Sequence, residues 1–188
     1  MPTGQALIAE IAETSVSAGS CAFWWLGQLG FVLKLAGRVA YVDAYLAPSP
    51  KRLVAPPLKP EEVTNADLVI GTHDHSDHID RQSWPAIAAA SPRARFVVPG
   101  ILADKLSRGL GIPADRFIGM EDGATVEVAG IRITGVAAAH ELLAPDPATG
   151  RFSFLGCVLE AGGLALYHAG DTCKYEGLET RLKRWRLD

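Results

Sequence analysis

The sequence contains no long apolar run. None of its hydrophobic stretches approaches the roughly 20 residues that a membrane-spanning helix needs, so we do not expect a membrane protein. A surplus of positive charge is also missing, because 18 Lys and Arg stand against 21 Asp and Glu and give a formal net charge of −3. Proteins that bind nucleic acids usually carry a basic excess. We therefore expect a chain that binds neither membranes nor nucleic acid.

Cysteine is scarce as well. The chain has only Cys21, Cys157 and Cys173, an odd number that argues against a disulfide framework and fits a reducing compartment. Residues 18–21 resemble a lipoprotein cleavage box, but the first basic residue is Lys34, so no positively charged signal region precedes them. We expect a cytoplasmic protein without a targeting segment.

The remaining composition is that of a globular protein. The 188 residues are 48% hydrophobic and 21% charged, which suits one domain covering residues 1–188. Short strand-like runs alternate with helical runs, and this order predicts a mixed α/β or α+β class. Helices are expected over residues 5–18, 81–90, 101–110 and 176–185, and strands over residues 23–26, 30–35, 38–43, 67–71, 96–98, 125–128, 131–136, 154–160 and 164–167.

A cluster of histidines follows the expected buried strand 67–71. Three of the five histidines, His73, His75 and His78, fall within six residues, and Asp77 completes the pattern H-x-H-x-D-H. Imidazole and carboxylate are suitable ligands for Zn²⁺, Mn²⁺ or Fe²⁺. In an extended segment His73 and His75 point the same way and can bind one ion, while Asp77 and His78 can face a second. The alternative, a solvated loop that caps the next helix, would suit a single histidine better.

Two further candidates lie just after expected strands. His140 follows the strand 131–136, and Asp171 follows the strand 164–167. Gly170 would allow the backbone to turn so that Asp171 points inward. Taken alone, His140 would be an ordinary hydrogen-bonded polar residue and Asp171 a turn residue. They become candidates because the histidine cluster needs partners from elsewhere in the chain.

Together these residues resemble the metallo-β-lactamase superfamily. Asp43, at the end of the strand 38–43, is similar to that family's buried structural Asp, and residues 23–31 (FWWLGQLGF) resemble the branch of L-ascorbate-6-phosphate lactonase and related metal-dependent hydrolases. The resemblance implies a four-layer αββα sandwich with a two-metal site at the edge between the sheets.

The resemblance also implies the roles of the site residues. The first metal would be held by His73, His75 and His140, the second by Asp77 and His78, and both by a bridging Asp171. The two divalent ions would be Zn or Mn, with Fe as a further candidate. Asp77 would in addition have a catalytic role in orienting a metal-bound hydroxide. His168 lies outside the ligand set that the resemblance implies. We expect it to hydrogen-bond a ligand and fix its orientation, and Asp43 to lie behind the site.

The family pattern supplies one more histidine to the second metal, from a strand after the last helix expected here. All five histidines already have roles, so we expect a C-terminally truncated domain whose sandwich lacks its C-terminal strand and helix. Residues 1–20 are expected to form an N-terminal extension.

The function implied is a metal-dependent hydrolase that cleaves an ester, lactone or phosphoester bond, with lactonase-like action on a sugar-acid phosphate as the branch analogy. The partner would be a small-molecule substrate, and an anionic one would require Arg or Lys near the metals. Two alternatives stay open: a metal-binding module without catalytic activity, and a mononuclear iron oxygenase of the same fold.

Overall fold

The structure, a computed structural model, describes residues 2–188 and contains two β-sheets. The first sheet has six strands in the order β1 (Ala22–Gly27), β2 (Gly30–Leu35), β3 (Arg38–Val42), β4 (Leu68–Ile70), β5 (Arg95–Pro99) and β6 (Phe117–Met120). The second has four strands in the order β10 (Leu164–His168), β9 (Leu155–Ala161), β8 (Ile131–Ala137) and β7 (Thr125–Val128). Strands β1 to β3 pair antiparallel, β3 to β6 pair parallel, and the second sheet is antiparallel throughout.

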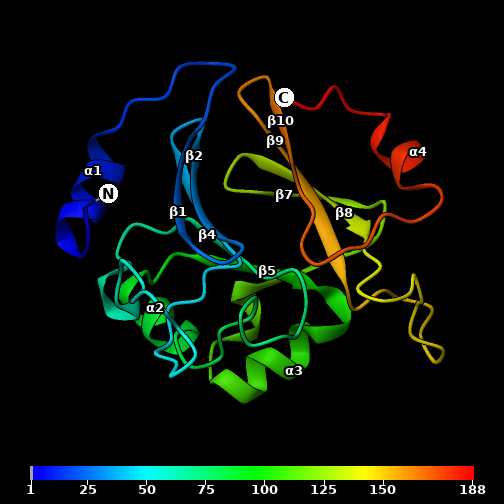
Figure 1. Ribbon diagram of the computed structural model, residues 1–188, viewed down its shortest axis with the longest axis horizontal. Helices are drawn as coiled ribbons and strands as arrows, with labels where there is room; N and C mark the ends of the chain where they lie inside the picture. The colour runs from blue at the N-terminus through cyan, green and yellow to red at the C-terminus, as the bar shows by residue number, and fades with distance from the viewer. Residues whose placement is uncertain (1) are drawn as a thin grey trace.

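Helices lie on the outer sides of both sheets. They are α1 (Gln5–Glu13), α2 (Trp84–Ala90), α3 (Gly100–Leu110) and α4 (Leu178–Leu182), with short 3₁₀ helices η1 (Pro60–Glu62) and η2 (Ala114–Arg116). In Figure 1, α1, α2 and α3 lie beyond the first sheet, and α4 lies beyond the second. The four-layer αββα arrangement predicted from the sequence is confirmed. Among residues 2–188, no helix combines the length and apolar character needed to span a membrane. All three cysteines are free.

Two apolar cores hold the two sheets and the helices α1 to α3 together. Between the sheets, Val42 and Ile70 of the first sheet pack with Leu155 and Cys157 of the second. Outside the first sheet, side chains of α1, α2 and α3 pack on the opposite faces of the same strands. All three residues of β4 are fully buried because this central strand is covered on both faces. Such a continuous apolar run is typical of a parallel strand between two layers.

Helix α1 is shorter than predicted and belongs to the core. The predicted helix over residues 5–18 ends at Glu13, where the Lys34 ammonium donates to the carbonyls of Ile11 and Ala12. A cation bound to the last carbonyls stabilises a helix end. Leu7 and Ile11 are fully buried against the first sheet. The expected N-terminal extension, residues 1–20, thus contains a helix of the αββα layers.

Strand β6 was not predicted. Its sequence, Phe-Ile-Gly-Met, contains a glycine that weakens a strand pattern. The glycine has a packing role, because a Cβ at Gly119 would lie 2.9 Å from the Cα of Gly100 at the start of α3. Close approach of α3 to the sheet therefore requires glycine at this strand position. The predictions for α2 and α4 were also too long, since they begin at Trp84 and Leu178.

Four strands direct their ends to one edge of the sandwich. Strands β3 and β4 are parallel, so Asp43 and Thr72 follow them at the same end of the first sheet. Strands β8 and β10 of the second sheet also run toward this edge, because β8 leads to His140 and β10 ends at His168. The backbone joins the sheets here, with the Leu155 amide donating to the Thr72 carbonyl at 3.1 Å.

Candidate metal centre

The sandwich edge brings together all six residues predicted as metal ligands. The histidine loop after β4 supplies His73, His75, Asp77 and His78, the loop after β8 supplies His140, and the turn after β10 supplies Asp171. One donor atom from each of His73, His75, His140 and Asp171 lies within 4.8 Å of the other three. The loop with His73 and His75, the residue His140 and the residue Asp171 are far apart in the sequence, so their convergence is a product of the fold.

Asp171 lies between two groups of imidazoles. Its Oδ2 is 3.9 Å from His73 Nε2 and 3.7 Å from His140 Nε2, while its Oδ1 is 3.3 Å from His78 Nε2. Asp77 Oδ2 lies 3.9 Å from the same His78 nitrogen. Each carboxylate oxygen of Asp171 thus faces a different set of donors. Gly170 enables this placement: its φ is +58°, and a Cβ there would lie 3.0 Å from the Thr72 side chain.

The donor set fits a divalent cation. Two ligands of a tetrahedral ion, each about 2.1 Å from it, lie roughly 3.4 Å apart. The donor atoms of this group have similar spacings. His73 Nε2 lies 2.9 Å from His75 Nδ1, and no two donor atoms of the group are more than 4.8 Å apart, so the ideal spacing lies within the observed range. Three imidazoles with one carboxylate suit Zn²⁺, Mn²⁺ or Fe²⁺. His73 is buried, whereas His75 is exposed, so one side of the group is open to solvent.

Burial keeps His73 in the form that binds metal. Desolvation, together with the neighbouring His78 and His75, lowers the pKa of His73 to about 4. At neutral pH this imidazole is uncharged and retains a lone pair for a cation.

Asp43 lies at the centre of a buried hydrogen-bond network behind these residues. The fully buried carboxylate accepts from the Thr72 amide and hydroxyl at 2.9 and 2.8 Å, and its Oδ2 is 2.8 Å from both His78 Nδ1 and His168 Nε2. Burial would raise the pKa of Asp43, but the two imidazoles hold it at about 2. With the carboxylate ionised, His78 donates from Nδ1 and presents its Nε2 lone pair to Asp171.

The same partners act on His78. Its burial would lower the pKa of the imidazole, but the hydrogen bond to Asp43 and the charges of Asp43, Asp171 and Asp77 raise it above the ordinary value. His168 differs from expectation in one respect: its hydrogen-bond partner is Asp43 and not a candidate ligand. It can therefore affect the orientation of His78 only through the carboxylate that the two imidazoles share.

Other residues of the site were not singled out from the sequence. Asp74 lies between His73 and His75 and forms ion pairs with Arg81 and Lys105, which tie the histidine loop to the region of α2 and α3. Its position inside the motif was visible in the sequence, but its partners were not. An aromatic ring, Phe154, packs beside the histidines, and no sequence pattern indicated that contact.

Asp80 anchors the loop after β3 to the turn before α2. This buried carboxylate accepts through Oδ2 from the amides of Leu46 and Ala47, both at 2.8 Å, and through Oδ1 from those of Gln82 and Ser83. An Asp shortly before a helix is a capping signal that the sequence did contain. Its four hydrogen bonds fix the segments that follow Asp43 and His78.

We expect Asp80→Ala to lower the free energy of unfolding by about 3 kcal/mol, because it leaves backbone amides without an acceptor in a buried place. Urea-induced unfolding measures this change. Asp146→Ala is a matched control, since Asp146 accepts similar loop hydrogen bonds, but these bonds are exposed to solvent. Equal unfolding midpoints for Asp80→Ala and the wild type would contradict the anchoring role.

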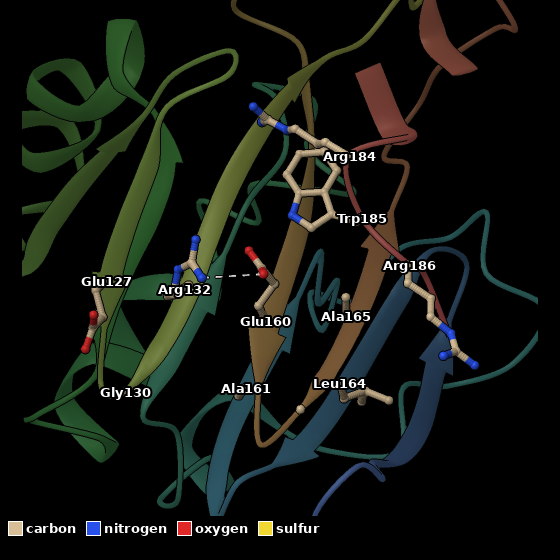
Figure 2. Close-up of a pocket in the computed structure, with 11 residues that line it drawn as sticks. Glu127, Gly130, Arg132, Glu160, Ala161, Leu164, Ala165, Arg184, Trp185 and Arg186 are labelled. Carbon is tan, nitrogen blue, oxygen red and sulfur yellow. Dashed lines mark ion pairs between the residues drawn. The ribbon is translucent and has the colours of Figure 1, made fainter. Parts of the chain in front are cut away.

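A hollow lies elsewhere on the molecule. Figure 2 shows this hollow, about 510 Å³ in volume, on the second sheet at the end where the β9–β10 turn lies. Glu127, Arg132 and Glu160 line it, and Arg132 pairs with Glu160 at 3.6 Å. None of the six predicted ligands lines this hollow. The candidate chemistry is therefore located at the opposite end of the sheet, where the histidines converge.

Comparison with known proteins places this geometry in a family. A family model described as a beta-lactamase superfamily domain matches residues 39–187. The chain is similar to metal-dependent hydrolases of the UPF0173 group. It is 28% identical over 155 residues to the one from Sulfurisphaera tokodaii, covering 82% of this chain and 63% of the relative. It is 31% identical over 160 residues to that of Aeropyrum pernix, covering 79% and 60%. The chain thus spans about three-fifths of the length of these relatives.

Solved structures give the same result for the fold. Igni18, a metallo hydrolase from Ignicoccus hospitalis, is 25% identical with a TM-score of 0.58, covering 84% of this chain and 63% of that one. A possible metal-dependent hydrolase from Veillonella parvula has a TM-score of 0.69 at 18% identity, covering 90% and 70%. The diiron β-hydroxylase CmlA from Streptomyces venezuelae reaches 0.63 at 16%, covering 94% and 34%. The last two likenesses concern the fold alone. The family match includes every predicted ligand, and on this ground the chain belongs to the metallo-β-lactamase superfamily.

Proposed function

We propose that this chain forms the metal centre of a hydrolase that cleaves an ester, lactone or phosphoester bond in a small molecule. One observation carries the proposal: donor atoms of His73, His75, His140 and Asp171 converge within 4.8 Å at a site with solvent access. The relatives from Sulfurisphaera tokodaii and Aeropyrum pernix are named metal-dependent hydrolases, which supports the same reaction type.

The proposal assigns the donors to two divalent ions. The three imidazoles of His73, His75 and His140 would hold the first, and His78 with Asp77 would hold the second. Asp171 would bridge them, because its two oxygens face the two sets of donors separately. When bound, such ions lower the pKa of water and polarise the bond that is cleaved. Zn or Mn suits this donor set, and Fe is a further candidate.

The residues of the chain supply the positioning and the proton transfer. Asp43 fixes the tautomer of His78, so that its Nε2 lone pair points into the site. Asp77 is 41% exposed in its side chain and borders the site, where the carboxylate oxygen that is not bound to a cation would accept a proton from an attacking water and orient it toward the substrate. The exposed edges of His75 and Asp77 mark the side from which substrate would enter.

The test combines metal binding with a hydrolase screen. Purified protein is loaded with Zn²⁺ or Mn²⁺, bound metal per chain is measured, and carboxylic esters, lactones and phosphodiesters are offered. We expect hydrolysis that disappears with a chelator and returns with the metal. Bound metal without turnover of any of these substrates would favour the inactive metal-binding module. Oxygen consumption by the Fe²⁺-loaded protein would favour the iron oxygenase, and each of these two results contradicts the hydrolase.

A further inference from the structure

One aromatic ring contacts all three histidines of the first proposed metal site. The ring centroid of Phe154 lies 5.0 Å from that of His73, 5.7 Å from that of His75 and 5.2 Å from that of His140. The planes are tilted by 30° and 43° to His73 and His140, and stand edge-on at 77° to His75. These distances lie within the range of attractive packing between aromatic rings. A phenyl ring cannot itself bind a cation as a ligand, so its contribution concerns the imidazoles.

The backbone of Phe154 occupies the seam between the two sheets. Its carbonyl accepts from the Ala138 amide at 3.0 Å, two residues before His140. The next amide, that of Leu155, donates to the Thr72 carbonyl at 3.1 Å, one residue before His73. Phe154 is therefore connected by hydrogen bonds to the segment that carries His140 and, through its neighbour, to the segment that carries the histidine motif.

The loop between β8 and β9 explains this location. The loop projects from the sandwich in Figure 1, where it is yellow, and its two ends lie at the sheet edge. His140 follows the first end and Phe154 precedes the second. The loop therefore begins near His140 and ends with Phe154, whose ring lies beside that imidazole.

We propose that Phe154 is a positioning residue that sets the orientation of His73, His75 and His140 toward a divalent cation. This inference rests on the proposed metal centre. Imidazole donors that must meet within 4.8 Å lose the freedom to rotate, and a rigid ring against all three reduces the number of orientations before the cation binds. The ring also occupies space beside the imidazoles, and an apolar neighbour lowers the local dielectric constant, which strengthens the electrostatic attraction between ligand and cation.

The experiment compares two half-buried phenylalanines of the same chain. Phe154→Leu removes the ring beside the histidines, and Phe117→Leu is the matched control, because Phe117 packs on Phe96 at a centroid distance of 5.4 Å, away from the site. Zn²⁺ affinity is measured by competition with a chelating dye, and the visible spectrum of bound Co²⁺ reports the coordination geometry. Unfolding of the metal-free proteins gives the stability change of each variant.

We expect Phe154→Leu to weaken Zn²⁺ binding by about tenfold, as is typical when a residue behind the ligands is changed, and to alter the Co²⁺ spectrum. Phe117→Leu is expected to lower stability without changing either metal property, and Phe154→Tyr, which keeps the ring, to retain both. Wild-type affinity and spectrum in Phe154→Leu would overturn this inference while leaving the metal centre intact. Equal losses in both leucine variants would also overturn it. A wild-type chain that binds no Zn²⁺ or Co²⁺ would remove the proposed function and this inference together.

Discussion

His75→Ala is expected to release the metal from the first proposed site and to abolish hydrolysis. The variant deletes one of three imidazole donors. Changes behind a metal ligand already reduce affinity about 10- to 100-fold, so we expect loss of a ligand to exceed about 100-fold. His75 is the informative choice because it is exposed, whereas His73 is buried and its removal would leave a cavity. The metal-free variant should keep the wild-type stability within about 0.5 kcal/mol, as is usual for surface substitutions.

Metal content, Zn²⁺ affinity and the metal-induced shift in melting temperature measure this prediction. A cation that binds only the folded chain raises the melting temperature, so the shift should vanish in the variant. Ser76→Ala is the control, because Ser76 is the exposed neighbour in the same loop and offers no imidazole. Undiminished Zn²⁺ affinity in His75→Ala would show that the group formed with His73 and His140 is not the binding site.

The sequence predicted the parts of the site that depend on local spacing. One short loop carries His73, His75, Asp77 and His78. The apolar run before this loop predicted that it follows a buried strand. The alternation of side chains in an extended segment predicted that His73 and His75 point the same way. The convergence of His140 and Asp171 on this loop required more, because it depends on both sheets ending at one edge. It was predicted through the family resemblance.

Contacts between distant segments could not be predicted from spacing. Asp43 and His168 lie 125 residues apart, and their hydrogen bond exists only because the second sheet closes on the first. No periodicity distinguishes Phe154, at the start of the strand predicted over residues 154–160, from an ordinary core residue. Strand β6 was missed for a related reason: its glycine is explained by the approach of Gly100 in the folded chain, which a linear pattern does not contain. The Asp43–His168 hydrogen bond, the place of Phe154 and strand β6 therefore depend on tertiary packing, which local sequence patterns do not predict.

Asp43→Ala is expected to be the most destabilising single change near the site. The carboxylate is fully buried and is the shared acceptor for Thr72, His78 and His168. Removing one partner from a buried charged network costs about 3–5 kcal/mol, because the others are left without a partner. Backbone strain adds to this loss. Asp43 has a φ of +45°, a left-handed conformation that Asp and Asn tolerate but that costs Ala about 1–2 kcal/mol.

Asp43→Asn separates the two effects. Asparagine tolerates the left-handed backbone and retains one oxygen acceptor, but its amide nitrogen faces groups that also donate, so part of the loss should remain. Urea unfolding of the metal-free proteins should therefore rank the wild type above Asp43→Asn, and Asp43→Asn above Asp43→Ala. Asp67→Asn is the control, because Asp67 is a half-buried carboxylate that pairs with the exposed Arg38 at 3.3 Å and accepts from the Val39 amide at 2.9 Å, and asparagine keeps one oxygen acceptor for that amide. If Asp43→Asn were no more sensitive to urea than Asp67→Asn, the buried carboxylate would not be what holds His78 and His168 in place.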